Sequence, residues 1–336
     1  MKNRRSFLDK LYKIFLYFFF ILNFPKLLQS KTTERSATKV LFHPITFNHH
    51  ISIDHPESPK RLEFIIKYLK KSNLLNLLEE ANIEEKKKID EWILKIHNKN
   101  HILNLKKIAP LAEKVSRTAI KTCMIGLDKI MNNQSKNIFC AVRPPGHHAL
   151  NTGKEEGFCY YNHVAVLGRY AQIKYKLKKI LIIDWDYHHG NSTEYFFYDD
   201  PSILFFSTHD ASAYPRTGSP SRKGYGKGLG YNINVDLKCG TNDNQIIAAF
   251  KNILLPAAEK FKPDLVIISA GFDSRIDDPL GCFKLTDKGF ETLTEISMSI
   301  AKKYCEGKLI SVLEGGYNFD GNAKASISHI KTLNKF

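Results

Sequence analysis

The chain has 336 residues, of which 43% are hydrophobic and 25% charged, and its formal net charge is +16. This composition excludes an intrinsically disordered chain and suits one large α/β domain or two small domains. A positive charge of this size attracts nucleic acid or anionic lipid. The lysines, however, are scattered through Lys- and Asn-rich segments and no nucleic-acid-binding motif is present, so we expect no specific nucleic-acid partner.

Residues 1–37 differ from the rest of the chain. Paired arginines at positions 4 and 5 precede Phe-Leu, and an apolar run follows from Leu11 to Leu22. This pattern resembles a bacterial twin-arginine export signal, although Asp9 precedes the Lys, no clear A-x-A cleavage site follows and the run is short for a full membrane span. We expect a signal or membrane anchor followed by a linker. The protein is then periplasmic or associated with the inner membrane if the signal is used, and otherwise cytoplasmic with an amphipathic extension.

Residues 38–336 alternate apolar runs with segments of helical periodicity and show no break in composition, so we predict one domain. In chain order, strands are expected at residues 39–43, 138–142, 180–183, 203–209, 231–235 and 264–270, and from residue 308 to a turn at 317. Helices are expected at residues 62–69, 111–131, 162–175, 242–261, 286–303 and 322–331, with two short helices between 78 and 110. This alternation predicts an α/β fold with a mostly parallel sheet.

The most informative stretch is residues 178–190, in which a strand rich in Ile leads directly into Asp184-Trp-Asp-Tyr-His-His-Gly. Polar groups packed at the mouth of a buried strand are costly unless something binds them. Asp186 and His188 are two residues apart and so point to the same side of an extended segment. One oxygen and one nitrogen ligand favour a divalent metal, zinc first. The alternative is a hydrogen-bonded Asp–His pair without a metal.

A second group of polar residues follows the strand at 138–142. Two prolines and a glycine precede His147 and His148 and hold the backbone in a fixed turn. A rigid pair of histidines at the end of a strand indicates proton transfer. Gly157 and Phe158, a few residues later, suggest a close backbone approach and an aromatic wall.

Two further strands end in the same way. Asp273 follows the strand at 264–270, and Tyr317 follows a Gly-Gly pair after the last strand. Because ligands bind at the carboxyl ends of parallel strands, we expect these residues to form one site with the histidines and carboxylates above. Asp184 and Ser207 are oxygen donors near strand ends and are candidates for a monovalent cation.

Three local features complete the pattern. Residues 191–193 (Asn-Ser-Thr) are expected to cap the next helix. The glycine-rich residues 223–230 lack the GxxxxGK[ST] spacing of a phosphate-binding loop. The six cysteines contain no CxxC pair, so we predict neither a zinc knuckle nor a small disulfide framework, and we expect Cys140 and Cys159 to be buried free thiols.

These motifs together resemble the zinc-dependent histone deacetylase family, with its bacterial acetylpolyamine amidohydrolase and acetoin-utilisation relatives. The motifs are His55–Arg61 (HPESPKR), Arg143–His148 (RPPGHH), Gly157–Phe158, Asp184–Gly190 (DWDYHHG), Gly271–Asp273 with Asp278–Leu280, and Glu314–Tyr317 (EGGY). The resemblance extends from about residue 39 to the C-terminus. It implies a three-layer arginase/deacetylase-like fold, with a mostly parallel eight-stranded sheet between helices.

The resemblance also implies the roles of individual residues. It implies zinc ligands at Asp186, His188 and Asp273, and a structural potassium ion near Asp184 and Ser207. It implies catalytic roles for His147 and His148 in proton transfer, Asp184 in orienting His147, and Tyr317 in stabilising the oxyanion. It implies that Gly157, Phe158 and Tyr214 contact the substrate.

The implied activity is hydrolysis of acetyl-lysine, acetylated polyamines or similar acylated amines by a zinc-activated water. If the chain is exported, histones are not its natural substrate. The sequence departs from the family where Asn191 replaces the Asp of some members, which gives His148 a neutral partner. Arg216, Arg222 and Lys223 also alter the glycine-rich loop over the site.

Three alternatives fit less well. A binuclear manganese ureohydrolase on the same fold needs further bridging carboxylates, which residues 189–191 do not supply. A catalytically silent module that binds a small molecule or acetyl-lysine would have lost Tyr317, a zinc ligand or both histidines, and all are present. A nucleic-acid binder would leave the clustered site residues without a purpose.

Overall fold

The computed structural model describes residues 38–86 and 88–335. These residues contain a single eight-stranded sheet in the order β2-β1-β3-β8-β7-β4-β5-β6, and every neighbouring pair of strands is parallel. The strands are β1 Lys39–Phe42, β2 Leu78–Glu80, β3 Asn137–Cys140, β4 Ile180–Asp184, β5 Ile203–His209, β6 Asn232–Asp236, β7 Leu265–Ala270 and β8 Leu309–Leu313. The predicted three-layer α/β fold is confirmed.

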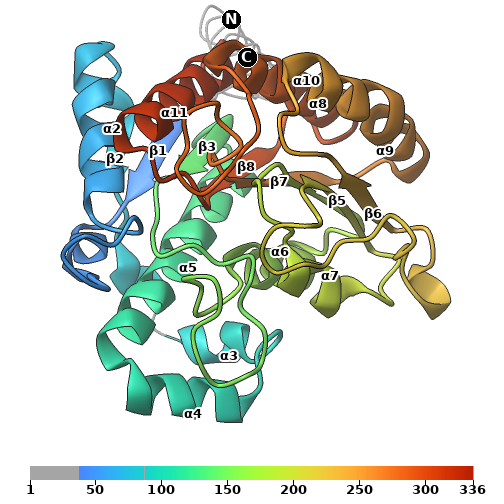
Figure 1. Ribbon diagram of the computed structural model, residues 1–336. Helices are drawn as coiled ribbons and strands as arrows, with labels where there is room; N and C mark the ends of the chain where they lie inside the picture. Colours follow the sequence, from blue (N-terminus) through green and yellow to red (C-terminus); the bar gives the residue numbers. More distant parts are fainter. Residues whose placement is uncertain (1–37, 87, 336) are drawn as a thin grey trace, which may run out of the picture. The chain divides into compact units, whose positions relative to one another are not determined.

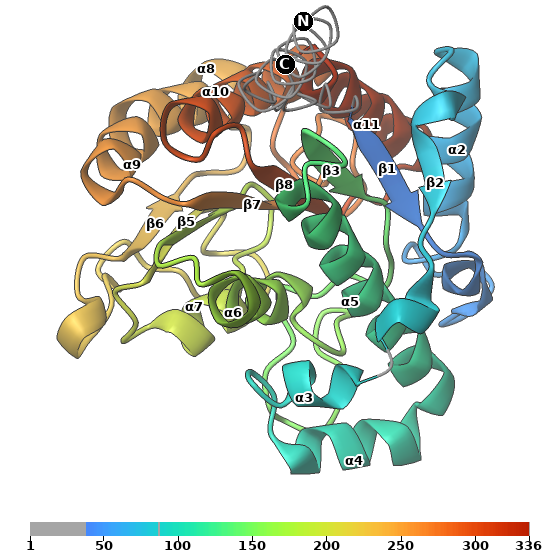
Figure 2. The ribbon, with the colours of Figure 1, turned by 180° about the vertical axis from the view of Figure 1, so that it is seen from behind.

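Helices cover both faces of the sheet (Figures 1 and 2). One face carries α2 Lys60–Lys71, α8 Asp243–Ala249, α9 Leu255–Phe261, α10 Asp287–Tyr304 and α11 Phe319–Leu333. The other face carries α3 Ile89–Ile93, α4 Lys99–Ile108, α5 Pro110–Met131, α6 His163–Tyr175 and α7 Asn191–Phe197. A π-helical turn, Phe250–Leu254, joins α8 to α9.

Strand β4 shows why the central strands are apolar throughout. Ile180 and Ile182 pack into the core beneath α5 and α6, whereas Leu181 and Ile183 pack into the core beneath α10. Successive side chains of a strand point to opposite faces, so a strand covered on both sides must be apolar at every position. The polar residues that follow therefore stand out at the edge of the sheet.

One local prediction was incomplete and another was wrong. The segment between residues 78 and 110 contains strand β2 as well as two short helices, and this strand was missed because it is a three-residue, charged edge strand (LEE). Asn191 does not cap α7 with its side chain. Helix α7 begins at Asn191, Gly190 occupies the N-cap position, and the Asn191 side chain binds His148 instead.

The cysteines divide into two groups. Cys140 and Cys159 are buried and free, as predicted, and so are Cys123 and Cys305. The other two cysteines form a disulfide between Cys239, which follows β6, and Cys282, which follows β7. The prediction of no disulfide framework thus missed one pair, because the two residues are 43 positions apart and only the fold brings them together.

Residues 1–37 lie outside the described residues, so the export signal, the anchor and the boundary at residue 38 stay predictions. Within residues 38–86 and 88–335, none of the helices combines the length and the apolar character needed to cross a membrane.

The strand order explains how one site is assembled. Strands β3, β8, β7 and β4 are consecutive neighbours in the sheet. They are also the four strands that are followed in the sequence by His147 and His148, Tyr317, Asp273, and Asp186 with His188. Because they are parallel, their carboxyl ends lie at one edge of the sheet.

Candidate active site

Asp186, His188 and Asp273 form a group whose ligand atoms all lie within 4.8 Å of one another. Asp186 and His188 follow β4, and Asp273 follows the neighbouring strand β7. The His188 Nδ1 atom is 2.9 Å from an oxygen of Asp273 and 3.2 Å from an oxygen of Asp186. The structure thus brings together the three residues predicted as metal ligands.

The charge balance of this group fits a bound cation. Asp186 and Asp273 are fully buried, and among the described residues no Lys or Arg forms an ion pair with either carboxylate. Burial and the neighbouring Asp186 raise the pKa of Asp273 to about 7. The basic groups that face these carboxylates are the imidazoles of His188 and, 3.7 Å from Asp186, of His147, and a bound cation would add further positive charge. One nitrogen and two oxygen ligands suit zinc and leave a fourth coordination position open.

The surrounding backbone fixes the two carboxylates. The Gly315 amide donates to Asp186 over 2.8 Å, and the Tyr187 amide donates to Asp273 over 2.7 Å. Gly315 must be glycine, because a Cβ atom there would lie 2.1 Å from an Asp273 oxygen. The ligands are therefore held in place by the protein alone.

His147 and His148 lie beside this group with ring centroids 4.0 Å apart. The His147 Nδ1 atom is 3.0 Å from a carboxylate oxygen of Asp184, and the His148 Nδ1 atom is 2.8 Å from the amide oxygen of Asn191. The structure therefore shows the charged partner for His147 and the neutral partner for His148 that the sequence indicated.

The two imidazoles differ in basicity. Burial lowers the pKa of both rings, but the carboxylates of Asp186 and Asp184 outweigh it at His147 and raise that pKa well above its usual value. At His148, burial and the adjacent His147 and His188 hold the pKa well below its usual value. Neighbouring groups with opposite shifts are typical of an acid–base pair.

Tyr317 is held at the same site by contacts on two sides. Its backbone amide donates to Asp278 over 2.6 Å, and the Arg61 guanidinium lies 4.9 Å from the centre of its ring. Arg61 also donates to the carbonyl of Gly316 over 2.7 Å. Burial raises the pKa of Tyr317 well above its usual value, so its hydroxyl remains a hydrogen-bond donor at neutral pH.

A cavity of about 500 Å³ adjoins these groups. It is lined by His148, Glu155, Gly157, Phe158, Tyr187, His188, Ala213, Tyr214, Leu280 and Tyr317. The Phe158 ring packs edge-on against Tyr317 at 5.7 Å, and the Tyr214 ring packs edge-on against His148 at 5.0 Å. A Cβ atom at Gly157 would lie 2.5 Å from the His148 ring, so glycine is required there. All three residues predicted to contact the substrate line this cavity.

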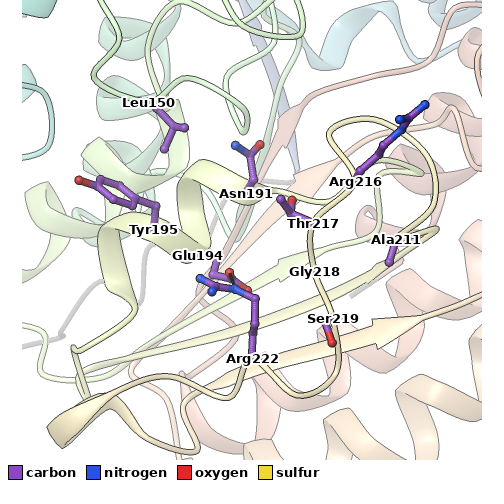
Figure 3. Close-up of a pocket in the computed structure, with 10 residues that line it drawn as sticks. All are labelled: Leu150, Asn191, Glu194, Tyr195, Ala211, Arg216, Thr217, Gly218, Ser219 and Arg222. Carbon is purple, nitrogen blue, oxygen red and sulfur yellow. Dashed lines mark hydrogen bonds and ion pairs between the residues drawn. The ribbon is translucent and has the colours of Figure 1, made fainter.

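A second pocket, of about 410 Å³, lies beyond Asn191 (Figure 3). Within it Arg222 forms an ion pair with the buried Glu194, which also accepts hydrogen bonds from Asn232 and Asn234. Figure 3 shows Arg216 pointing away from this ion pair. Both arginines line this pocket and neither lines the 500 Å³ cavity.

The two residues of the predicted potassium site lie on β4 and on β5, the strand that neighbours β4. Asp184 and Ser207 are direct partners in neighbouring strands, and the Ser207 hydroxyl is 2.8 Å from His209 Nδ1. Asp184 accepts hydrogen bonds from His147 and from the Asp186 amide. The carboxylate of Asp184 and the hydroxyl of Ser207 are oxygen ligands of the kind that a hard monovalent cation prefers.

Several residues of the site were given no individual role from the sequence, although all except Glu155 lie in the motifs that carry the resemblance. Glu155, Tyr187 and Leu280 line the cavity, Asp278 and Arg61 hold the Tyr317 segment, and Glu314 contacts the histidine turn. Tyr187 had a visible signal, since it lies between two predicted ligands. The others depend on contacts between segments far apart in the chain.

A parallel sheet whose carboxyl edge gathers an Asp–His–Asp metal group, a histidine pair and a tyrosine defines a candidate metal-dependent hydrolase. The model of the histone deacetylase domain matches residues 55–333 of this chain. The chain therefore belongs to the histone deacetylase family and is a hydrolase of the deacetylase class.

Individual relatives agree with this assignment. A probable deacetylase of Archaeoglobus fulgidus is 32% identical over 85% of this chain and 82% of its own length. The polyamine deacetylase HDAC10 of Danio rerio is 44% identical over 62% of this chain, but only 31% of that protein is matched. The crystal structure of the HDA15 HD domain superposes with a TM-score of 0.82, with 33% identity over 90% of this chain and 89% of that one.

Proposed function

We propose that the protein is a zinc-dependent deacetylase that hydrolyses the amide bond of acetyl-lysine, acetylated polyamines or similar acylated amines. The observation that carries the proposal is the shared cavity. His148, His188 and Tyr317 border the same 500 Å³ space, and His188 belongs to the candidate metal group. An acetamide in that space meets a metal ligand set, an acid–base pair and a hydroxyl donor together.

Asp186, His188 and Asp273 would hold the zinc ion. When bound, zinc supplies a Lewis acid for the acetamide carbonyl and lowers the pKa of water at the site. The Tyr317 hydroxyl donates a hydrogen bond to the oxygen that becomes negative as the carbonyl carbon turns tetrahedral. A preformed donor of this kind typically contributes about 3–4 kcal/mol to transition-state stabilisation.

His147 and His148 move the protons. One imidazole removes a proton from the attacking water, and the other delivers a proton to the nitrogen of the leaving amine. Asp184 orients the His147 ring through its Nδ1 atom. Asn191 accepts from His148 without adding charge, which is consistent with the low pKa of that ring.

The walls of the cavity suit a linear substrate. The rings of Phe158 and Tyr214 line the cavity and would pack against the aliphatic chain of a substrate. Among the residues that the structure describes, Glu155 is the one carboxylate that lines this space, and no Lys or Arg lines it. A substrate that carries a positive charge away from its neutral acetamide is therefore favoured, and acetylated polyamines and basic acetyl-lysine peptides both carry one. We also propose that Asp184 and Ser207 hold a structural potassium ion.

Acetate release by the full chain tests this function. An acetyl-lysine peptide, acetylspermidine and acetylputrescine are each incubated with the zinc-loaded protein, and acetate is measured. We expect release from at least one of them, and the ratio of the kcat/KM values then identifies the substrate class. No release from any, with one equivalent of zinc bound, would support a non-catalytic module that binds acetylated ligands instead.

A further inference from the structure

We infer that Glu314 is a positioning residue for His147 and His148, an inference that rests on the proposed function. Glu314 follows β8 and is fully buried. One of its carboxylate oxygens accepts two backbone hydrogen bonds, from the Gly146 amide over 2.6 Å and from the His147 amide over 3.2 Å. These two amides belong to the turn that carries both histidines.

The turn has little freedom to find another acceptor. A Cβ atom at Gly146 would lie 2.7 Å from the Tyr161 carbonyl, so this backbone is packed tightly against the next segment. On the other side, Ser192 donates to the His147 carbonyl through its hydroxyl over 2.8 Å and its amide over 3.2 Å. The peptide groups around His147 are thus fixed from both directions, and Glu314 supplies one of the two anchors.

A side-chain acceptor is needed because the amides are buried. A buried N–H group without a hydrogen-bond partner is energetically costly. The backbone can avoid this cost only by moving, which would shift the imidazoles relative to the metal group. Because displacements of about 1 Å can reduce turnover by about 100-fold, the Glu314 side chain affects catalysis without touching substrate.

The segment that contains Glu314 also holds the other parts of the site. The Glu314 carbonyl accepts a hydrogen bond from Arg61, the Gly315 amide binds Asp186, and Tyr317 ends the segment. The contacts with Arg61 and Asp186 are made by backbone atoms of Glu314 and Gly315. The contact with the histidine turn is made by the side chain of Glu314. A side-chain substitution therefore separates the histidines from the metal ligands and from Tyr317.

The test compares Glu314→Gln with Glu314→Leu in the full chain. Glutamine keeps an oxygen that accepts the two amides, and leucine has a similar size but no acceptor. We expect Glu314→Leu to lower kcat by about 10–100-fold, with KM within about threefold and one equivalent of zinc retained. Glu314→Gln should stay within about threefold of the wild-type kcat, because its oxygen preserves the geometry.

Glu113→Leu is the matched control, since Glu113 is a buried carboxylate of α5 that binds Arg117 and Tyr161. This variant loses a buried carboxylate and should keep its kcat. Equal losses of kcat in Glu113→Leu and Glu314→Leu would overturn the inference, because general destabilisation would then explain both. A full kcat in Glu314→Leu would also overturn it.

Hydrogen exchange provides a readout that does not depend on turnover. Amide exchange at Gly146 and His147 should be slow in the wild type and in Glu314→Gln and faster in Glu314→Leu. Unchanged protection in Glu314→Leu would overturn the positioning role. A wild-type protein that hydrolyses no acetylated amine contradicts the proposed function instead, and the exchange experiment still shows whether Glu314 holds the turn.

Discussion

The position of the Tyr317 hydroxyl depends on how the rest of the residue is held. Asp278 accepts from the backbone amide of Tyr317, and Arg61 and Phe158 contact its ring. Burial keeps the hydroxyl protonated, and this makes it a donor at neutral pH. Donation to a developing oxyanion is an interaction made only in the transition state. Its loss should therefore reduce kcat and leave substrate binding largely unchanged.

We predict that Tyr317→Phe lowers kcat by about 100- to 1,000-fold, with KM and zinc content near those of the wild type. Steady-state kinetics with an acetyl-lysine peptide and metal analysis of the same sample provide the measurement. Tyr161→Phe is the control, because Tyr161 is a buried tyrosine whose hydroxyl binds Glu113. Full turnover by Tyr317→Phe would refute the role of the hydroxyl.

Glu155 is a second residue whose individual effect can be tested, because it places a carboxylate at the wall of the 500 Å³ cavity. We predict that Glu155→Gln raises KM for acetylspermidine by about two- to fivefold, the size expected for an exposed ion pair. KM for an acetylated amine that carries no positive charge should not change. Glu91→Gln is the control, because Glu91 is an exposed carboxylate of α3, and this variant should keep the wild-type KM for both substrates. A similar rise in KM for charged and uncharged substrates would rule out charge selection by Glu155.

Most elements of the sheet could be predicted because their signals are local. The Ile-rich residues of β4 and the alternating residues of β6 each carry a pattern within a few positions. Strand β2 could not be recognised, because its three residues are charged or partly exposed and only pairing with β1 defines it. The local Asn-Ser-Thr signal at Asn191 failed because a tertiary contact with His148 takes the side chain.

A disulfide that no local sequence pattern indicated joins the loops after β6 and β7. The Cys239–Cys282 disulfide closes a loop of 43 residues. The backbone supports the same connection, since the Gly240 amide donates to the Cys282 carbonyl over 2.9 Å. A link of this kind stabilises mainly by restricting the unfolded chain.

We predict that Cys239→Ser lowers the free energy of unfolding by about 2–4 kcal/mol, the typical contribution of a disulfide. Urea denaturation of the wild type and the variant measures this difference. A reducing agent should lower the stability of the wild type and leave that of Cys239→Ser unchanged. If reduction leaves the wild type equally stable, the disulfide contributes nothing to the fold.

In the molecule as a whole, the site is a consequence of strand order. The residues Asp186, Asp273, His147 and Tyr317 are predictable from sequence because each follows a recognisable strand of a parallel sheet, and these strands prove to be neighbours. The supporting contacts are not predictable in this way. Glu314 binds an amide 168 positions away, and such a pairing is defined only when the sheet has formed.

In the proposed function, hydrolysis depends on a zinc ion bound by Asp186, His188 and Asp273. The most direct test measures turnover of an acetylated amine by the full chain before chelation, after chelation and after stepwise addition of zinc, beside Asp273→Asn. We predict that activity is lost with the metal and returns in proportion to zinc up to one equivalent, and that Asp273→Asn does not recover. Full turnover by the metal-free protein, or full recovery by Asp273→Asn, would contradict this account.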